Sequence, residues 1–153
     1  MKKLFVLFSS LLIGVSVFAN NPGEIEENII RSFEKSFPRA QQVKWSETPT
    51  SWVVSFYANE TLSRVIYTKD GTIIQLVRYY QKQQLPFYLY EKAGREYSGK
   101  EIYGVVEVSL LSNPGSYSNI TYYITLEDSK YWTTVKADSH GNLSTVKKIR
   151  KAL

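Results

Sequence analysis

The stretch "FPRAQQVKW" (residues 37–45) separates two hydrophobic periods, and this change decides the fold. Before it, residues 24–37 crowd glutamate into the first turn and repeat apolar residues at helical spacing, namely Ile25, Ile29, Ile30, Phe33 and Phe37. Pro38 ends this helix because its ring removes a backbone donor and favours extended geometry at the residue before it. From residue 42 the apolar period is two, as in a strand. The stretch therefore predicts a helix followed at once by a β-sheet.

Three further strands are predicted after this stretch, because apolar residues alternate at 51–57, 62–68 and 72–80. Residues 58–61 are expected to form the first hairpin turn. Asp70 and Gly71 are expected to form the second, since Asp-Gly tolerates the positive φ of a type I′ turn. The pairs across this second hairpin are then Tyr67 with Ile74 and Val65 with Leu76.

The second half of the chain repeats this order. Residues 83–97 predict a shorter helix that begins near Pro86, and strands are expected at 102–111, 119–127, 130–138 and 143–149, with a loop at 112–119. An offset of 70 residues lays 51–79 over 121–149 without a gap, with Trp52 on Tyr122, Val65 on Val135, Leu76 on Val146 and Gly71 on Gly141. The stretch "YSGKEIYGV" (97–105) also echoes the opening stretch at an offset of 60.

These patterns predict an α+β fold, built as a tandem repeat of α-β4 units. The first unit spans residues 20–82 and the second spans residues 83–153. We expect the two units to form one compact body, an antiparallel sheet with two helices packed on one side.

Hairpin register assigns the side chains of this sheet to two faces. The face expected to pack against the helices is apolar and carries Trp52, Val54, Phe56, Val65, Tyr67, Ile74, Leu76, Tyr122, Ile124, Leu126, Val135, Ala137 and Val146. The opposite face is expected to carry the residues that alternate with these, Thr145 and Lys147 included. It mixes Tyr, Trp, Arg and Lys, of which Tyr, Trp and Arg are enriched at interface hot spots.

The candidate partner-binding residues on this opposite face are Tyr57, Arg64, Tyr79, Tyr123, Trp132, Lys136 and Lys147. A sheet face that is only solvated is mostly Thr, Lys, Glu and Ser, so these side chains favour a protein or peptide partner. Three alternatives stay open. The face is covered by its own chain, it is covered by a second copy, or it carries ordinary strand-forming residues.

The N-terminus has the pattern of a secretory signal peptide over residues 1–19. Lys2 and Lys3 precede a long apolar run, and small residues at Val17 and Ala19 predict cleavage after Ala19. The alternative is an uncleaved N-terminal membrane anchor. Because the chain has no Cys, no lipidated cysteine can follow the signal. The pattern predicts a periplasmic or secreted protein with no integral membrane segment after cleavage.

The composition argues against an enzyme and against a cofactor. The chain has no Cys and one His, which excludes the strong zinc, haem and thiol signatures, so no metal site is expected. Asp138, Ser139 and His140 are consecutive turn residues and cannot form a catalytic triad. No glycine-rich phosphate loop is present. Catalytic residues are therefore expected to be absent.

The charge of the chain does not favour a nucleic-acid partner. Cleavage would remove Lys2 and Lys3 and lower the net charge from +5 to +3. Much of the remaining excess lies at residues 147–153, which we interpret as a solvated tail. A contact with acidic envelope polymers is the alternative.

Residues 87–90 ("FYLY") allow two interpretations. Together with Tyr79 and Tyr80 they resemble a set of rings for stacking on sugars or peptides. Their place at the start of the second helix favours the other interpretation, in which they pack that helix onto the sheet.

The motifs taken together resemble the PepSY-like, beta-lactamase-inhibitor-protein-like exported domains of Bacteroidetes. The residues that carry the resemblance are Phe37-Pro38, Ala40, Val43, Trp45, the Asp70-Gly71 turn and Leu85-Pro86. The second half departs from the family pattern, with Ser98-Gly99 in place of Tyr-Pro and His140-Gly141 in place of Asp-Gly.

The resemblance implies a tandem α-β4 architecture with helices on one side of an antiparallel sheet. Most members of this family have no assigned function. The namesake inhibitors bind an enzyme with the concave sheet surface, and PepSY modules are suspected of restraining peptidases. A fold alone does not transfer either role.

The sequence thus favours a non-catalytic exported binding module that takes a protein or peptide on the sheet face opposite the helices. Inhibition or regulation of an envelope hydrolase is the expected role of such a module. The alternative function is binding of a small envelope ligand, a glycan or a lipid, through aromatic side chains near the second helix.

Overall fold

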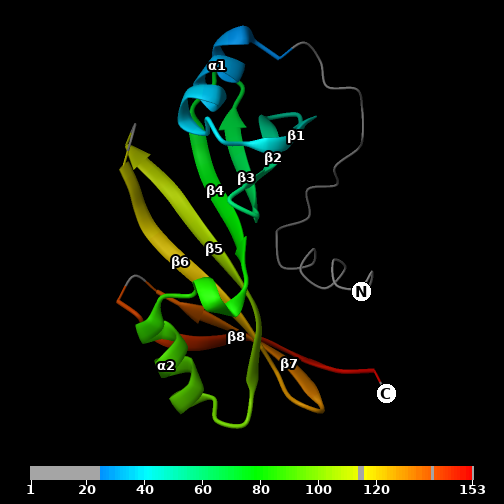
Figure 1. Ribbon diagram of the computed structural model, residues 1–153, viewed down its shortest axis with the longest axis vertical. Helices are drawn as coiled ribbons and strands as arrows, with labels where there is room; N and C mark the ends of the chain where they lie inside the picture. Colours follow the sequence, from blue (N-terminus) through cyan, green and yellow to red (C-terminus); the bar gives the residue numbers. More distant parts are fainter. Residues whose placement is uncertain (1–24, 114–115, 139, 153) are drawn as a thin grey trace.

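The computed structural model describes residues 25–113, 116–138 and 140–152, so the predicted signal peptide lies outside the described residues. Figure 1 shows a long, twisted sheet with α1 at one end and α2 beside the other. The elements in chain order are α1 (Glu27–Ser36), β1 (Gln41–Glu47), β2 (Ser51–Ala58), β3 (Thr61–Thr68), β4 (Ile73–Tyr80), the 3₁₀-helix η1 (Lys82–Gln84), α2 (Phe87–Glu96), β5 (Glu101–Asn113), β6 (Ser116–Glu127), β7 (Tyr131–Ala137) and β8 (Leu143–Arg150).

The strands form one antiparallel sheet in the order β1 to β8, each strand pairing with its neighbours in sequence. The predicted α+β fold is therefore confirmed. Both helices lie on the same side of this sheet. Leu76 of the α1 core pairs with Ser109, and Val105 of the α2 core lies four residues before Ser109 on the same strand and so on the same face.

The opening stretch joins α1 to the sheet through aromatic side chains. Phe33 lies 5.4 Å from both Phe37 and Trp45 and 5.1 Å from Phe56, measured between ring centroids. The helix ends at Ser36 because Pro38 follows Phe37, whose N–H still donates to the Phe33 carbonyl at 2.8 Å. The core beneath α1 consists of Ile29, Phe33, Trp52, Val54, Phe56, Val65, Tyr67 and Leu76.

A second core lies beneath α2. It consists of Leu85, Leu89, Ala93, Val105, Ile124, Leu126, Val135 and Ala137. Both predicted helices are shorter than expected, and the chain before α2 turns as η1 rather than as part of that helix. Pro86 is the residue that precedes α2, a position near the helix start that tolerates proline.

The two-residue turn in which both residues have positive φ lies between β2 and β3, not between β3 and β4. Asn59 and Glu60 have φ of 49° and 63°, which fits the type I′ geometry of a two-residue hairpin. In the next hairpin only Gly71 has positive φ, at 88°, and its N–H donates to the Thr68 carbonyl at 3.1 Å. The prediction of a type I′ turn at Asp70-Gly71 was therefore wrong.

This longer turn shifts the register at the start of β4. Tyr67 pairs with Ile73 rather than Ile74, while Val65 still pairs with Leu76 as predicted. Ile74 is exposed as a result.

A second irregularity corrects the faces of β8. Val135 pairs with Thr145 and Thr134 pairs with Lys147, so Val146 is the extra residue of a bulge. Thr145 therefore lies on the helix side, where its Oγ1 lies 3.1 Å from the Tyr97 hydroxyl, and Val146 is exposed. The predicted face was therefore wrong for Thr145 and for Val146.

The predicted loop at 112–119 is also wrong. Strand β5 continues to Asn113 and β6 begins at Ser116, so the two longest strands form a hairpin that extends past their neighbours. Within the residues that the structure describes, no helix is long and apolar enough to cross a membrane.

Candidate functional site

The sheet face opposite the helices, called the far face below, carries every candidate partner-binding residue. Residues directly opposite in an antiparallel pair share a face, so the pairing can be followed from strand to strand. It places on the far face the seven predicted residues, Tyr57, Arg64, Tyr79, Tyr123, Trp132, Lys136 and Lys147.

One row of the far face crosses all eight strands. This tyrosine row comprises, from β1 to β8, Gln41, Tyr57, Leu62, Tyr79, Val106, Tyr123, Lys136 and Ser144. Its tyrosines lie on alternate strands, β2, β4 and β6, which spaces them about 10 Å apart along the sheet. Four of the seven predicted residues belong to this row.

The other three predicted residues lie on either side of the tyrosine row. Arg64 lies one row away, in line with Lys44, Ser55, Val77, Val108 and Thr121. On the opposite side, Lys147 lies one row away with Gly104, Thr125 and Thr134. Trp132 lies one row further out, with Glu101, Glu127 and Ile149.

The centre of the far face is apolar. Val77 and Val106 are 1% and 5% exposed, although both helices lie on the other side of the sheet. Tyr79 pairs with Val106 and is half-buried. Burial raises the pKa of Tyr79, and the nearby Arg64 opposes this rise. The tyrosine hydroxyl therefore stays protonated at neutral pH and can donate a hydrogen bond.

The three middle rows of the far face, which are the tyrosine row and the rows of Arg64 and Lys147 on either side of it, are positively charged. They carry Lys44, Arg64, Lys136 and Lys147 and no carboxylate. None of these four cations forms an ion pair with the described part of the chain. Arg64 donates through Nε to the Ser55 hydroxyl at 3.3 Å, a neutral partner that leaves its charge uncompensated.

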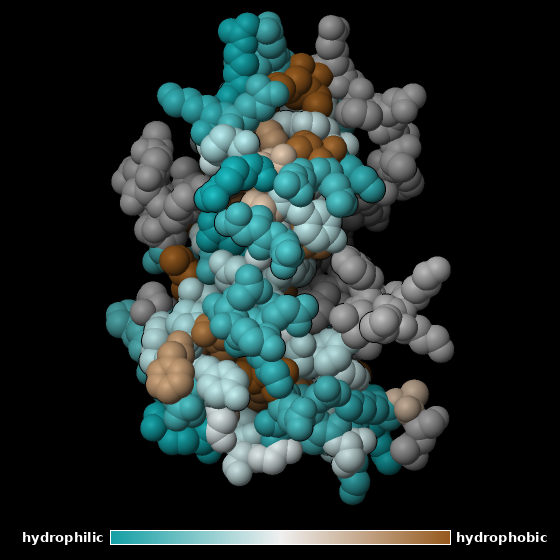
Figure 2. All heavy atoms as spheres, viewed as in Figure 1, coloured by the Kyte–Doolittle hydropathy of each residue, from teal (hydrophilic) through white to brown (hydrophobic). Residues whose placement is uncertain are grey.

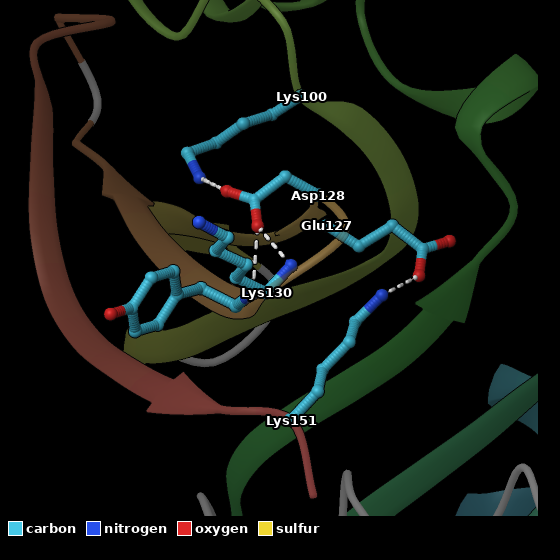
Figure 3. A network of polar contacts seen from close by, with 6 residues as sticks. Lys100, Glu127, Asp128, Lys130 and Lys151 are labelled. Atoms are coloured by element: carbon cyan, nitrogen blue, oxygen red, sulfur yellow. Dashed lines mark hydrogen bonds and ion pairs between the residues drawn. The ribbon is translucent and has the colours of Figure 1, made fainter. Parts of the chain in front are cut away.

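Trp132 lies at a corner of the sheet where its side chain already contacts other residues of the chain. Its ring meets that of Tyr103 edge to face at 4.4 Å, and the Lys151 ammonium lies 4.3 Å from its ring centroid. Lys151 also donates to Glu127 at 2.9 Å. Figure 3 shows this ion pair beside that of Lys100 with Asp128. These contacts give Trp132 a structural role that the tyrosine row does not have.

Asp128 in the same corner holds the turn between β6 and β7. Its carboxylate accepts from the Lys100 ammonium and from the backbone N–H groups of Lys130 and Tyr131, at 2.8 and 2.7 Å for the latter two (Figure 3). The hydrogen bond from Lys100, and then those from the backbone, hold the pKa of Asp128 far below its ordinary value.

A buried carboxylate lies on the helix side, where β4 meets β5. The side chain of Glu107 is 6% exposed and accepts from the Arg78 guanidinium at 2.8 Å, the Tyr80 hydroxyl at 3.1 Å and the Ser109 hydroxyl at 3.3 Å. Burial, and then the Glu107 charge, raise the pKa of Tyr122 to about 12. Because both carboxylate oxygens already have donors, this cluster joins the two strands rather than offering a ligand site.

Sequence reasoning missed Glu107, although a signal exists. It is the one charged residue in the apolar run "VVEV" (105–108), and a charge in such a run needs a buried partner. The apolar centre at Val106 and Val108 was also missed, because no face was assigned to β5.

The prediction that the aromatic residues at the start of α2 pack the helix onto the sheet was wrong. Of the residues 87–90, only Leu89 is buried, while Phe87, Tyr88 and Tyr90 are 75%, 55% and 44% exposed. Figure 2 shows a hydrophobic side chain projecting from the lower left of the surface, where α2 lies in Figure 1. One turn of helix can bury only one face, and Leu89 and Ala93 occupy it.

His140 lies in the β7–β8 turn and is exposed, as expected. Its backbone N–H donates to Asp138 at 2.8 Å, and the Asn142 amide donates to the same carboxylate at 3.0 Å. These bonds, that of the Asn142 side chain first, lower the pKa of Asp138. Among the residues that the structure describes, no three His, Cys, Asp or Glu side chains gather as metal ligands would.

Comparisons with known proteins establish the fold. No protein-family model matches the chain, and no curated protein sequence matches it. Among solved structures, a BLIP-like protein from Bacteroides fragilis is similar, with a TM-score of 0.68 and 15% identity, over 86% of this chain and 92% of its own. A DUF2874-family protein from Bacteroides ovatus has a TM-score of 0.65 and 15% identity, over 84% of this chain and 89% of its own.

A candidate periplasmic protein from Bacteroides eggerthii is also similar, with a TM-score of 0.63 and 15% identity, over 84% of this chain and 90% of its own. The predicted resemblance to BLIP-like proteins of Bacteroidetes is thus confirmed in the fold.

Proposed function

We propose that this protein is a non-catalytic exported module that captures a protein or peptide on the far face of its sheet. The observation that carries the proposal is the tyrosine row, which crosses all eight strands between rows that carry unpaired cations. Tyrosine and arginine around a buried apolar centre are typical of the residues that dominate binding energy at interfaces.

The exported location and the role in regulating a hydrolase are parts of the same proposal. The similarity to a candidate periplasmic protein supports a periplasmic or secreted location, together with the signal-peptide pattern of residues 1–19. The similarity to a BLIP-like protein supports an inhibitor or regulator of an envelope hydrolase. We propose no catalytic step for the protein itself.

We also propose that the two α-β4 segments are repeats of one unit. The turns 68–72 and 138–142 have the same two backbone hydrogen bonds, from Gly71 to Thr68 and Thr68 to Thr72, and from Gly141 to Asp138 and Asp138 to Asn142. Both glycines have positive φ. Each lies against its own helix, since a Cβ on Gly71 would meet Ile29 and one on Gly141 would meet Tyr88. These matching turns and helix contacts support the view that the two segments are repeats. Strands from both segments contribute to the tyrosine row.

Capture from a native envelope extract with the purified mature protein tests the function. We expect the Tyr57→Ala, Trp132→Ala double variant to lose the captured partner while it stays folded, with a lowered melting temperature because Trp132 contacts Tyr103 and Lys151. A second pair, Tyr79→Ala with Tyr123→Ala, removes the middle of the row without touching the Trp132 corner. Unchanged capture by both pairs would rule out the far face.

The matched control removes exposed rings from the other side of the molecule. Phe87→Ala with Tyr90→Ala deletes two aromatic side chains of α2 that are more exposed than those of the row. We expect full capture by this variant. Loss of capture here, with retention in the row variants, would move the site to α2.

The exposed rings of α2 favour a second candidate function, binding of a glycan or lipid. Phe87 is 75% exposed, and an exposed ring of this kind is typical of a stacking or membrane-interface residue. A thermal-shift screen with oligosaccharides and with lysolipid micelles tests it. Stabilisation that disappears in the Phe87→Ala, Tyr90→Ala variant would support this function, and an unchanged melting temperature with every ligand would rule it out.

A further inference from the structure

We infer that the occupant of the far face is an acidic protein segment with an apolar centre. The inference rests on the proposed function and names the chemistry of its partner. Its basis is the distribution of charge and apolar side chains on the far face, which the sequence alone did not reveal.

The charges in the three middle rows of the far face are all positive. Lys44, Arg64, Lys136 and Lys147 lie in the three middle rows, which carry no carboxylate. The two acids of this face, Glu101 and Glu127, lie together in the outer row of Trp132, and Glu127 is paired with Lys151. Unpaired cations without acids attract a negative partner and repel a positive one.

The cations also flank the apolar centre rather than filling it. Arg64 lies on β3 and Lys136 on β7, with the partly exposed Val108 and Tyr79 on the strands between them. Four strand spacings separate the two cations, roughly 19 Å along the sheet. An extended segment rises about 3.3 Å per residue, so about six residues span this distance. The partner segment should therefore place two acidic residues about six positions apart around apolar ones.

A second copy of this chain and a neutral glycan match the charges of the far face less well than an acidic segment does. A second copy of this chain would bring the same four cations against themselves, which is unfavourable unless they pair with acids elsewhere on the surface. A neutral glycan would leave the charges of Arg64 and Lys136 unused.

Selection from a phage-displayed library of random 12-residue peptides on the immobilised mature protein tests the inference. We expect enriched peptides to carry acidic residues on both sides of an apolar centre. A synthetic copy of the leading peptide should bind at least tenfold more weakly to the Arg64→Glu, Lys136→Glu variant, and more weakly to the wild type as NaCl is raised.

The control is Lys35→Glu with Arg95→Glu, which makes the same change in net charge at exposed positions of the two helices. We expect its affinity to stay within about twofold of the wild type, in the range typical of distant surface charges. If the Arg64→Glu, Lys136→Glu variant has a lowered melting temperature, Lys44→Glu with Lys147→Glu provides a second charge reversal within the three middle rows.

The outcomes separate this inference from the proposed function. Neutral or basic peptides that lose binding in the Tyr79→Ala, Tyr123→Ala variant would overturn the acidic segment and leave the far face as a binding site. Peptides indifferent to every far-face variant would overturn both. A library without any enriched peptide would overturn the acidic segment alone, because capture from the extract tests the face independently.

Discussion

Single residues fix this fold at the points where the chain reverses. Gly71 closes the β3–β4 turn at φ of 88°, a backbone conformation that costs residues with a Cβ about 1–2 kcal/mol. A Cβ there would also lie 3.1 Å from Ile29 Cγ1 of α1, closer than ordinary contact. The glycine thus serves the turn and the packing of the helix above it.

We expect Gly71→Ala to lower the free energy of unfolding by about 2 kcal/mol, since strain and close contact act together. Gly94→Ala is the matched control, because a Cβ there meets nothing within 4 Å and the residue lies within α2. We expect that change to raise the free energy of unfolding by about 0.5–1 kcal/mol. Urea denaturation measures both, and equal effects would contradict the assigned role of Gly71.

Asp128 gives the molecule a pH dependence in acid. Its pKa in the folded state lies below the ordinary value of 3.8, mainly because Lys100 donates to it. A lowered folded pKa adds stability that is present above pH 3.8 and is lost as pH falls further, when the carboxyl takes up a proton. We expect Asp128→Asn to lower the melting temperature at pH 7 and to differ less and less from the wild type below pH 3.8.

The control for this effect is Glu91→Gln, an exposed acid of α2. We expect its melting curve to follow the wild type at every pH. A difference between Asp128→Asn and the wild type that stays constant from pH 7 to pH 2 would show that the charge of Asp128 is not the cause.

At the scale of the elements, the strands follow their hydrophobic period except where a turn or bulge adds a residue. The prediction that Leu76 and Val146 are equivalent fails for this reason: Leu76 is 1% exposed and Val146 is 48% exposed. Periodicity identifies each strand but cannot place an extra residue, because a bulge changes the hydrogen bonding and leaves the composition unaltered.

We expect these two positions to respond differently to truncation. Leu76→Ala should lower the free energy of unfolding by about 3 kcal/mol, because it leaves a cavity beneath α1. Val146→Ala should change it by at most about 0.5 kcal/mol, as exposed substitutions do. Chemical denaturation of both variants is the measurement, and a large loss at Val146 would contradict the bulge in β8.

In the helices too, residue spacing predicts some buried positions correctly and others wrongly. Spacing correctly places Ile29, Phe33 and Leu89 against the sheet. It fails for Phe87, Tyr88 and Tyr90, because an apolar ring signals burial only if its side of the helix faces the core. Leu89 and Ala93 occupy the buried side of α2, so these three rings lie on its exposed side.

At the scale of the whole molecule, the eight strands turn scattered residues into one surface. Tyr57 and Lys136 are separated by about half of the chain, yet the pairing places them in the same row. Sequence alone assigned the seven candidate residues to one face because alternation fixes the face. It could not predict that four of them align, because alignment depends on the pairing of β4 with β5, which no local pattern specifies.

Methyl NMR of the labelled mature protein, titrated with the captured partner, tests the far face most directly. The signals of Leu62, Val77, Val106 and Val108 report on the far face, and those of Leu89, Val105 and Ile124 report on the helix side. We predict that binding shifts the first set and leaves the second almost unchanged. Shifts concentrated at Leu89 and its neighbours, with the far-face valines unmoved, would contradict the account.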